Sequence, residues 1–229
     1  MKALLLSSLV KVFKDKEPNF KEFNSFSSFK NEKFSFQLGI LAETAEETSV
    51  TFEIDSDIKN NITPYIVKNV PFRKNKSHNY DSFHYDVNRK EFPDLLEPTG
   101  NTIELKPDEW TALWFEFKAD SSVTGEHIIK IILSSNGKTI EKEFTLNIID
   151  KELPKQELLY TNWFHNDCLC TYYKVAVFSE EYWRIVENYI RNAVEHGVNM
   201  LLTPIFTPPL DTAVGGERPT VQLVKVIKE

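Results

Sequence analysis

Short runs of alternating apolar and polar residues fill the first 150 positions of the chain. The segments 34–40, 49–55 and 113–117 place apolar side chains at every second position, which is typical of a strand with one buried face. The segment 62–70 is a further candidate strand. Because no stretch before residue 150 carries a convincing helical period, the pattern predicts an antiparallel, immunoglobulin-like β-sandwich.

The sequence predicts a hairpin near the end of this region. Residues 128–133 are apolar on both faces, as expected for a strand at the centre of a sheet. Asn136 and Gly137 follow, and this pair tolerates the positive φ angles of a type I′ turn. The segment 144–148 supplies the returning strand. Residues 1–10 have a short apolar core and no clear cleavage site, so we interpret them as a first strand, with a remnant signal segment as the alternative.

A polar segment, 73–101, interrupts the predicted strands. It is rich in Lys, His, Asn and Asp, and it ends with Pro93 and Pro98, five residues apart. Proline lacks the backbone donor that regular structure needs and restricts the residue before it. We therefore expect a long surface loop here, and long ordered loops are often functional.

A helical period replaces the alternation between residues 179 and 197. Ser179 can cap the start of the helix, where Glu180 and Glu181 favour the positive end of the helix dipole. Gly197 supplies the left-handed stop. One apolar face runs along the whole segment: Tyr182, Ile185, Val186, Tyr189, Ile190, Ala193 and Val194.

This helix lies between two strand-like segments, so we expect a β-α-β unit. The first segment ends at 163–167, and the second, 198–202, is apolar on both faces like a buried parallel strand. Such a unit opens a (β/α)8 barrel, whose active site lies at the C-terminal ends of its strands. The charged linker 150–155 contains a proline. We therefore predict a β-sandwich domain in 1–152, followed by the first β-α-β of a truncated barrel in 153–229.

Candidate site residues follow the two barrel-type strands. After the first strand, His165 and Asp167 are spaced two apart and could bind sugar hydroxyls or orient a general acid. After the second strand come further candidates for substrate binding: Thr207, Asp211, Glu217 and Arg218. The alternatives are purely structural: a strand-end hydrogen-bond pair that fixes the loop in the first case, and a salt bridge of Glu217 or Arg218 that pins the loop in the second.

Composition narrows the possible functions. The chain has 229 residues, of which 41% are hydrophobic, and a formal net charge of -7, which argues against a nucleic-acid partner. No run approaches the roughly 18 apolar residues of a membrane span. Cys168 and Cys170 are too close in sequence to bridge readily, which agrees with a reduced, cytoplasmic compartment. Because no Cys/His cluster accompanies them, we expect neither a metal nor a cofactor.

Three stretches resemble glycoside hydrolase family 123 and its large bacterial relatives of unassigned function: Trp163-Phe164-His165 with Asp167, Ser179-Glu180-Glu181 with Trp183, and the segment 202–220. The segments 92–98 and 110–117 loosely resemble the N-terminal sandwich of that family. The resemblance implies a retaining β-N-acetylgalactosaminidase type of activity on glycans that contain N-acetylhexosamine. In that family the acetamido group of the substrate is the nucleophile, and an adjacent Asp-Glu pair orients it and supplies the acid/base.

The chain departs from the family at this pair, because no adjacent Asp-Glu occurs after Glu152. A complete barrel needs roughly 200 residues, whereas about 75 follow the linker. We therefore expect an N-terminal fragment that is inactive by itself. The alternative is a non-catalytic β-sandwich module that binds carbohydrate or protein. An incomplete barrel also predicts self-association through its unpaired strand edge and half-covered helix.

Overall fold

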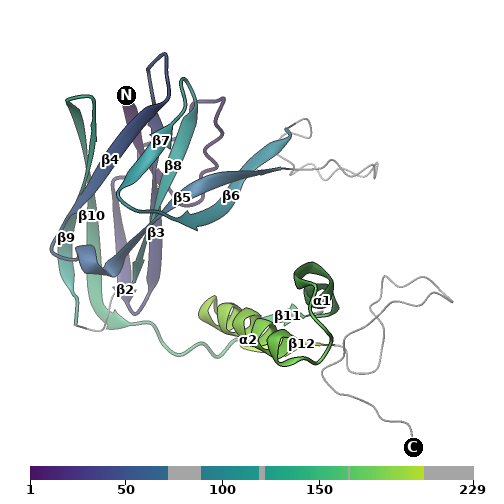
Figure 1. Cartoon of the computed structure of the whole chain (residues 1–229). Helices are drawn as coiled ribbons and strands as arrows, with labels where there is room; N and C mark the ends of the chain where they lie inside the picture. Colours follow the sequence, from purple (N-terminus) through teal and green to yellow (C-terminus); the bar gives the residue numbers. More distant parts are fainter. Residues whose placement is uncertain (72–88, 119–121, 165, 204–229) are drawn as a thin grey trace, which may run out of the picture. The chain divides into compact units, whose positions relative to one another are not determined.

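The computed structural model describes residues 1–71, 89–118, 122–164 and 166–203, with the backbone alone for Asp167. The chain divides into two compact units, Met1–Leu153 and Pro154–Glu229, called here the first unit and the second unit (Figure 1). In its described part, the first unit consists of β-strands and one short 3₁₀ helix, Lys59–Asn61. The described part of the second unit combines two short strands with two helices.

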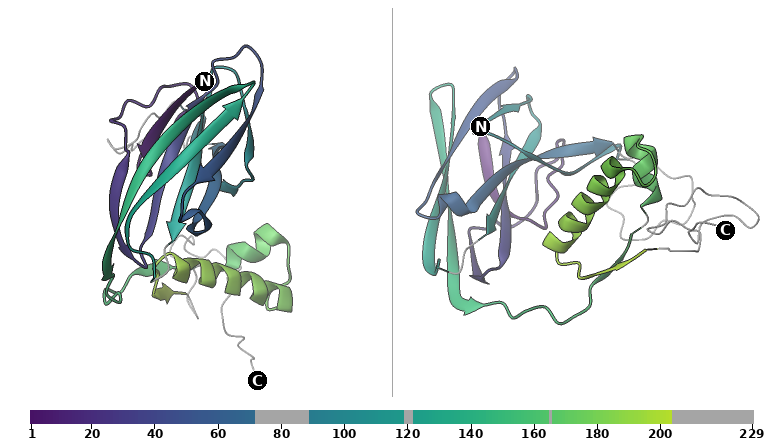
Figure 2. Two further views of the ribbon diagram at one scale, coloured as in Figure 1. Left: turned by 90° about the vertical axis from the view of Figure 1, so that its left-hand side faces the viewer. Right: turned by 60° about the horizontal axis from the view of Figure 1, so that its bottom comes forward.

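Two five-stranded sheets make up the described part of the first unit, and Figure 2 shows their twist from two directions. One sheet is antiparallel throughout and has the order β1 (Lys2–Ser7), β3 (Lys33–Leu41), β8 (Trp110–Lys118), β5 (Ile62–Pro71), β6 (Glu91–Pro98). The other has the order β2 (Ser25–Lys30), β10 (Lys138–Glu152), β9 (Gly125–Ser135), β4 (Thr48–Asp55), β7 (Thr102–Leu105). The prediction of mostly antiparallel sheets is confirmed, while the assignment to the immunoglobulin-like class stays a prediction.

Alternate side chains of both sheets meet in one hydrophobic core. In β8, Leu113, Phe115 and Phe117 are fully buried, whereas the two residues between them are only half-buried. Phe36 of β3 stacks on Phe144 of β10 with 4.3 Å between the ring centroids, so the two sheets touch through their aromatic faces. The alternation seen in the sequence therefore corresponds to one face in this core and one face toward solvent.

Two local predictions for the first unit are confirmed. Ser135 pairs with Lys138 across the β9–β10 hairpin, and the turn residues Asn136 and Gly137 have φ angles of 49° and 73°. Both angles lie in the left-handed region that a type I′ turn requires. Residues near the N-terminus form β1, which pairs with β3, as expected for a first strand.

The prediction of an irregular loop over 73–101 is wrong at its C-terminal end. Glu91–Pro98 forms β6, and β7 begins at Thr102. In the described part of the sheet, β6 lies at the edge and pairs only with β5. Proline is tolerated on an edge strand because its missing N–H can face solvent, and a register shift in the β5–β6 pairing falls beside Pro93. The rest of the predicted loop, 72–88, lies outside the described residues.

Strand β2 was not predicted, and its pairing is not antiparallel. It lies parallel to β10, with Ser25 opposite Thr145 and Phe29 opposite Ile149. The sequence of β2, Ser-Phe-Ser-Ser-Phe-Lys, has no sustained alternation of apolar and polar residues. Its partner strand is far away along the chain, so no local pattern could indicate the contact.

Strand β9 is central in its sheet, as predicted, but it is buried on one face only. Ile129, Ile131 and Leu133 are fully buried, whereas Ile128 on the opposite face is 45% exposed. An apolar run does not by itself prove that both faces are covered, because apolar atoms make up much of any protein surface.

The second unit contains the predicted helix and the predicted parallel strand pair. Its elements are β11 (Thr161–Trp163), α1 (Asp167–Tyr173), α2 (Glu180–Glu195) and β12 (Met200–Leu202). The Ser179 hydroxyl accepts a 3.1 Å hydrogen bond from the Tyr182 N–H and so caps α2, and Gly197 follows the helix with φ of 87°. The short helix α1 was not predicted.

Burial in the second unit is sparse. Leu169, Tyr182 and Val186 form a small buried cluster between α1 and α2. Met200 and Leu202 of β12 are 37% and 40% exposed, so the prediction that this strand is buried on both faces is wrong. No helix in the described part of the chain combines the length and the apolar character needed to cross a membrane.

Candidate functional site

The carboxyl ends of β11 and β12 lie side by side in the second unit. The two strands are parallel, with Trp163 opposite Leu202, and the Phe164 N–H donates a 2.7 Å hydrogen bond to the Leu202 carbonyl. Residues that follow the two strands therefore lie at the same edge of this small sheet. The first described polar side chains at that edge belong to Asn166 and Thr203, and we call this place the strand-end site.

Asn166 is fully buried, and neither its amide nitrogen nor its amide oxygen has a hydrogen-bond partner in the described structure. Asn166 is the N-cap residue of α1, yet its side chain accepts no hydrogen bond from the backbone of that helix. The hydroxyl oxygen of Thr203 is also buried without a partner. Each unpaired buried polar group costs about 1–3 kcal/mol, so a water or a ligand that forms a hydrogen bond with either residue would be stabilised.

Sequence reasoning missed both residues. Their signal was position alone: each follows one of two parallel strands within three residues of its end. Asn166 lies between His165 and Asp167 in the sequence, and a neutral amide there carries no local signal of acid/base chemistry. Burial of the Asn166 side chain, which makes it notable, depends on packing that no local pattern reveals.

The predicted site residues fall almost wholly outside the described residues. His165 lies outside them, and so do the four candidates after the second strand: Thr207, Asp211, Glu217 and Arg218. Asp167 begins α1, and only its backbone is described. The predicted roles of these six residues in substrate binding therefore stay predictions.

Several aromatic side chains of β11, α1 and α2 are exposed to solvent. Trp163, at the end of β11, is 66% exposed, and Tyr172 is 78% exposed. The hydroxyls of Tyr173 and Tyr189 lie 3.1 Å apart, and this hydrogen bond raises the pKa of Tyr189 above its ordinary value. Rings of this kind offer a flat apolar face together with a polar tip, a combination suited to sugar rings.

Metal-binding chemistry has no candidate in the part of the chain that the structure describes. Within 1–71, 89–118, 122–164 and 166–203, no three His, Cys, Asp or Glu side chains come together as a metal site would require. The polar groups at the strand-end site are a neutral amide and a hydroxyl. These groups can donate and accept hydrogen bonds but do not themselves supply acid/base chemistry near neutral pH.

Comparison with known families finds a match for the C-terminal part of the chain. A family model described as the catalytic domain of glycoside hydrolase 123 matches residues 163–229. That segment begins at the last residue of β11 and includes the strand-end site. The resemblance of this chain to glycoside hydrolase family 123 is therefore confirmed, on a match that covers its C-terminal part.

A solved structure extends the likeness over most of the chain. A family 123 glycoside hydrolase from Clostridium perfringens, determined in a study of glycolipid glycan hydrolysis, matches 87% of this chain with a TM-score of 0.71 and 14% sequence identity. At that identity the match concerns the fold alone. This chain spans 37% of the length of the Clostridium protein.

Other structural matches are much weaker. The N-terminal domain of PorA matches 66% of this chain and 99% of its own, with 7% identity and a TM-score of 0.32. The CooA pilin subunit from enterotoxigenic Escherichia coli matches 67% of this chain and 100% of its own, with 12% identity and a TM-score of 0.32. Scores this low carry no argument about function. No curated protein sequence matches the chain.

Proposed function

We propose that the chain is the N-terminal part of a glycoside hydrolase that acts on N-acetylhexosaminides, in the retaining, substrate-assisted manner. The first unit would be an accessory domain, and the second unit would begin the catalytic barrel. The observation that carries the proposal is the parallel β11–β12 pair joined through α2, together with the family match over 163–229. In barrels of this type, substrates bind at the carboxyl ends of the strands.

Within this proposal, the strand-end site is one wall of the substrate pocket. His165 and Asp167 would bind or orient the sugar from the first strand. Thr207, Asp211, Glu217 and Arg218 would do so from the second strand. The buried, unpaired polar groups of Asn166 and Thr203 support a polar ligand at this edge, because a sugar offers both hydroxyl donors and acetamido acceptors.

The chain by itself should not hydrolyse glycosides. Substrate-assisted hydrolysis needs a carboxyl group to protonate the leaving oxygen and a second carboxylate to orient the acetamido group. No adjacent Asp-Glu pair follows Glu152 in this sequence. The purified protein should therefore release no nitrophenol from 4-nitrophenyl N-acetyl-β-galactosaminide above the buffer rate. Turnover that disappears in Asp167→Ala would contradict the proposed inactivity.

The coding sequence beyond codon 229 tests the proposal most directly. If it continues in frame into further β-α repeats with an adjacent Asp-Glu pair, the glycosidase assignment stands. A stop codon at this place in several related genomes would contradict it and favour a module that only binds. The coding sequence upstream of codon 1 serves as the comparison, because the proposal expects no barrel strands to be encoded there.

We also propose that copies of the chain associate weakly through the second unit. Its helix α2 leaves Val194 60% exposed and Tyr189 41% exposed. Size-exclusion chromatography over a range of concentrations should show larger species for the native chain, with less association in Val194→Lys. Asn192→Lys, at an exposed polar position of the same helix, is the charge-matched control. A strict monomer at every concentration would contradict this proposal.

A further inference from the structure

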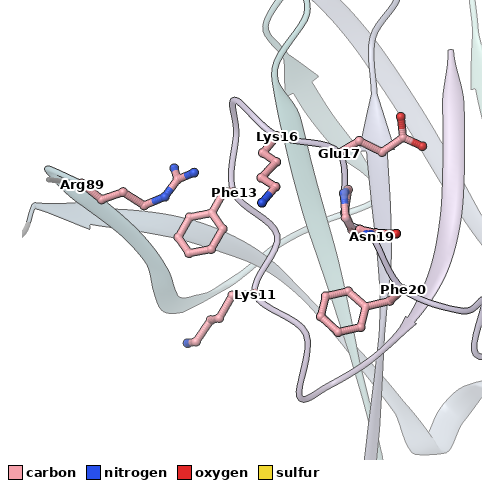
Figure 3. A pocket seen from close by; sticks show the side chains of 8 residues that line it. Lys11, Phe13, Lys16, Glu17, Asn19, Phe20 and Arg89 are labelled. Carbon is pink, nitrogen blue, oxygen red and sulfur yellow. The ribbon is translucent and has the colours of Figure 1, made fainter. Parts of the chain in front are cut away.

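A pocket of about 360 Å³ lies in the first unit, between segment 11–20 and Arg89 (Figure 3). Segment 11–20 connects β1 to β2, and Arg89 precedes β6. None of the residues that line this pocket belongs to the second unit, so it is separate from the strand-end site. Its volume is within the range of small-molecule sites and suits one or two sugar rings.

The pocket is positively charged in a protein whose net charge is -7. Its charged lining consists of Lys11, Lys16 and Arg89 against the single carboxylate Glu17. Glu17 forms an ion pair with Lys2, which does not line the pocket, so its charge is compensated from outside. Lys11 and Arg89 are compensated in the same way by Asp94 and Asp15, so the uncompensated charge of the lining is that of Lys16, and it favours an anionic ligand.

Two of the three cations are already held in place. The Lys11 ammonium donates a 3.0 Å hydrogen bond to the Pro93 carbonyl. Arg89 lies 2.6 Å from the Asp15 carboxylate, and its guanidinium carbon is 3.9 Å from the centre of the Phe13 ring. The hydrogen bond from Arg89 holds the pKa of the Asp15 carboxyl below its usual range. These contacts hold Lys11 and Arg89 against neighbouring segments of the chain.

Lys16 is the cation that remains available. Its side chain is exposed and makes no hydrogen bond or ion pair with any other residue that the structure describes. In Figure 3, the Lys16 side chain extends toward the space between the rings of Phe13 and Phe20. A ligand that enters this space would meet an ammonium group with unused donors.

An exposed aromatic ring and an amide complete the lining. Phe20 is 59% exposed, an uncommon state for this residue type. Asn19 is exposed beside it and offers both a donor and an acceptor. An apolar ring face, an amide and an ammonium group match the three features of an acidic sugar. The C–H face of the pyranose can stack on Phe20, its hydroxyls can bond to Asn19, and its carboxylate can pair with Lys16.

We infer that this pocket binds a carboxylated sugar, such as a uronic acid residue of an acidic glycan. The inference stands on the first unit alone and holds whether or not the second unit belongs to a glycosidase. It assigns a recognition role to segment 11–20: the first unit would hold the protein on acidic glycans through the cation and the ring that this segment presents.

Isothermal titration calorimetry of the full chain with a galacturonic acid trisaccharide tests this site. Lys16→Gln should raise the dissociation constant about tenfold, as expected for the loss of one charge-assisted hydrogen bond. Phe20→Ala should raise the dissociation constant several-fold. Lys21→Gln removes the same charge from an exposed lysine that does not line the pocket, so its affinity should equal that of the native chain. Circular dichroism verifies that each variant is folded.

Neutral and inorganic probes decide the ligand class. A galactose trisaccharide should bind at least tenfold more weakly than the acidic trisaccharide, because it cannot pair with Lys16. Inorganic phosphate should not displace the acidic trisaccharide at equal concentration. The inference is overturned if the acidic trisaccharide does not bind, or if the neutral one binds as well. It is also overturned if phosphate displaces the trisaccharide, or if Lys21→Gln weakens binding as much as Lys16→Gln.

Discussion

The two units of this chain differ in how much of their apolar surface they cover. The first unit buries aromatic and aliphatic side chains from both sheets in a continuous core. The buried apolar side chains of the described second unit are Leu169, Tyr182, Val186 and Val198. The same part of the second unit exposes many large ones: Leu158, Leu159, Tyr160, Trp163, Tyr172, Tyr173, Val177, Tyr189, Val194, Met200 and Leu202. The described part of the first unit has a continuous hydrophobic core, whereas the described part of the second unit leaves most of its large apolar side chains exposed to solvent.

This difference in burial follows from how the elements of each unit cover one another's apolar faces. A two-sheet structure closes on itself, because each sheet covers the apolar face of the other. Within residues 154–203, apart from His165, the two parallel strands and two helices of the second unit leave apolar side chains of the strands exposed, as Met200 and Leu202 are. Each square ångström of apolar area left in water forfeits about 25 cal/mol of stabilisation. The second unit should therefore be the less stable part of the chain.

The largest expected effect is a difference in hydrogen exchange between the units. Backbone amides of α2 should exchange on the order of a hundredfold faster than those of β8 and β9, because local opening is easiest where few apolar contacts must be broken. Exchange detected by mass spectrometry on the native chain measures both regions in one experiment. Equal protection of 180–202 and 110–148 in a strict monomer would remove the contrast between the units.

The next effect concerns the core between the sheets. Phe36→Ala should destabilise the first unit by about 3–5 kcal/mol, because it leaves a cavity beside Phe144 and Phe115. Urea unfolding followed by circular dichroism and tryptophan fluorescence measures this loss. Tyr182→Ala is the counterpart in the second unit and should leave the main transition of the first unit in place. A single transition shifted equally by both variants would mean that the units unfold together.

A smaller effect sharpens the description of α2. Ser179→Ala should destabilise this helix by about 1 kcal/mol, because the 3.1 Å bond to the Tyr182 N–H is lost. Exchange rates along α2 should rise while those of the first unit stay unchanged. Ser179→Asp keeps a capping oxygen and should preserve the native rates. If the aspartate variant behaves like the alanine variant, the cap does not stabilise α2.

The smallest effect is a pH dependence in the first unit. Asp57 lies 2.8 Å from the His127 ring, and this hydrogen bond holds the pKa of the Asp57 carboxyl below its ordinary value. A depressed folded pKa gives stability that is present above the unfolded pKa and is lost as the pH falls through the folded pKa. Asp57 is largely exposed, so the contribution should be about 0.5 kcal/mol or less.

Thermal unfolding at pH 6 and at pH 3 tests this linkage. Asp57→Asn should lower the midpoint slightly at pH 6 and by less at pH 3, relative to the native chain, because protonation of Asp57 at low pH removes its contribution. Asp55→Asn, at an exposed position nearby, is the control and should have no such pH-dependent effect. A larger difference at pH 3 than at pH 6 would reverse the sign and contradict the assignment.

The strands of the first unit were predictable where the side-chain pattern is local. Leu113, Phe115 and Phe117 alternate with half-buried residues because a pleated strand presents every second side chain to the core. The β9–β10 turn followed from Asn136 and Gly137 alone. Strand β6 was missed because proline was taken to bar regular structure, whereas an edge strand tolerates it.

The site was less predictable than the fold. Position after the two parallel strands points to one edge of the small sheet, where the structure describes Asn166 and Thr203, while the roles of the predicted site residues stay predictions. It could not indicate that Asn166 is fully buried and unpaired, since burial depends on contacts between distant parts of the chain. The pocket of the first unit was also missed, because Lys16, Phe20 and Arg89 come from two segments that no periodicity connects.

The parallel contact between β2 and β10 sets an order of events during synthesis. The two strands are about 120 residues apart, and contacts at such separations form late because the loop between them must close first. While the ribosome is still making β10, β2 has no partner on the sheet that it will join. Segment 11–20 lies between β1 and β2, so the strand that follows it is joined to its sheet only after β10 has been made.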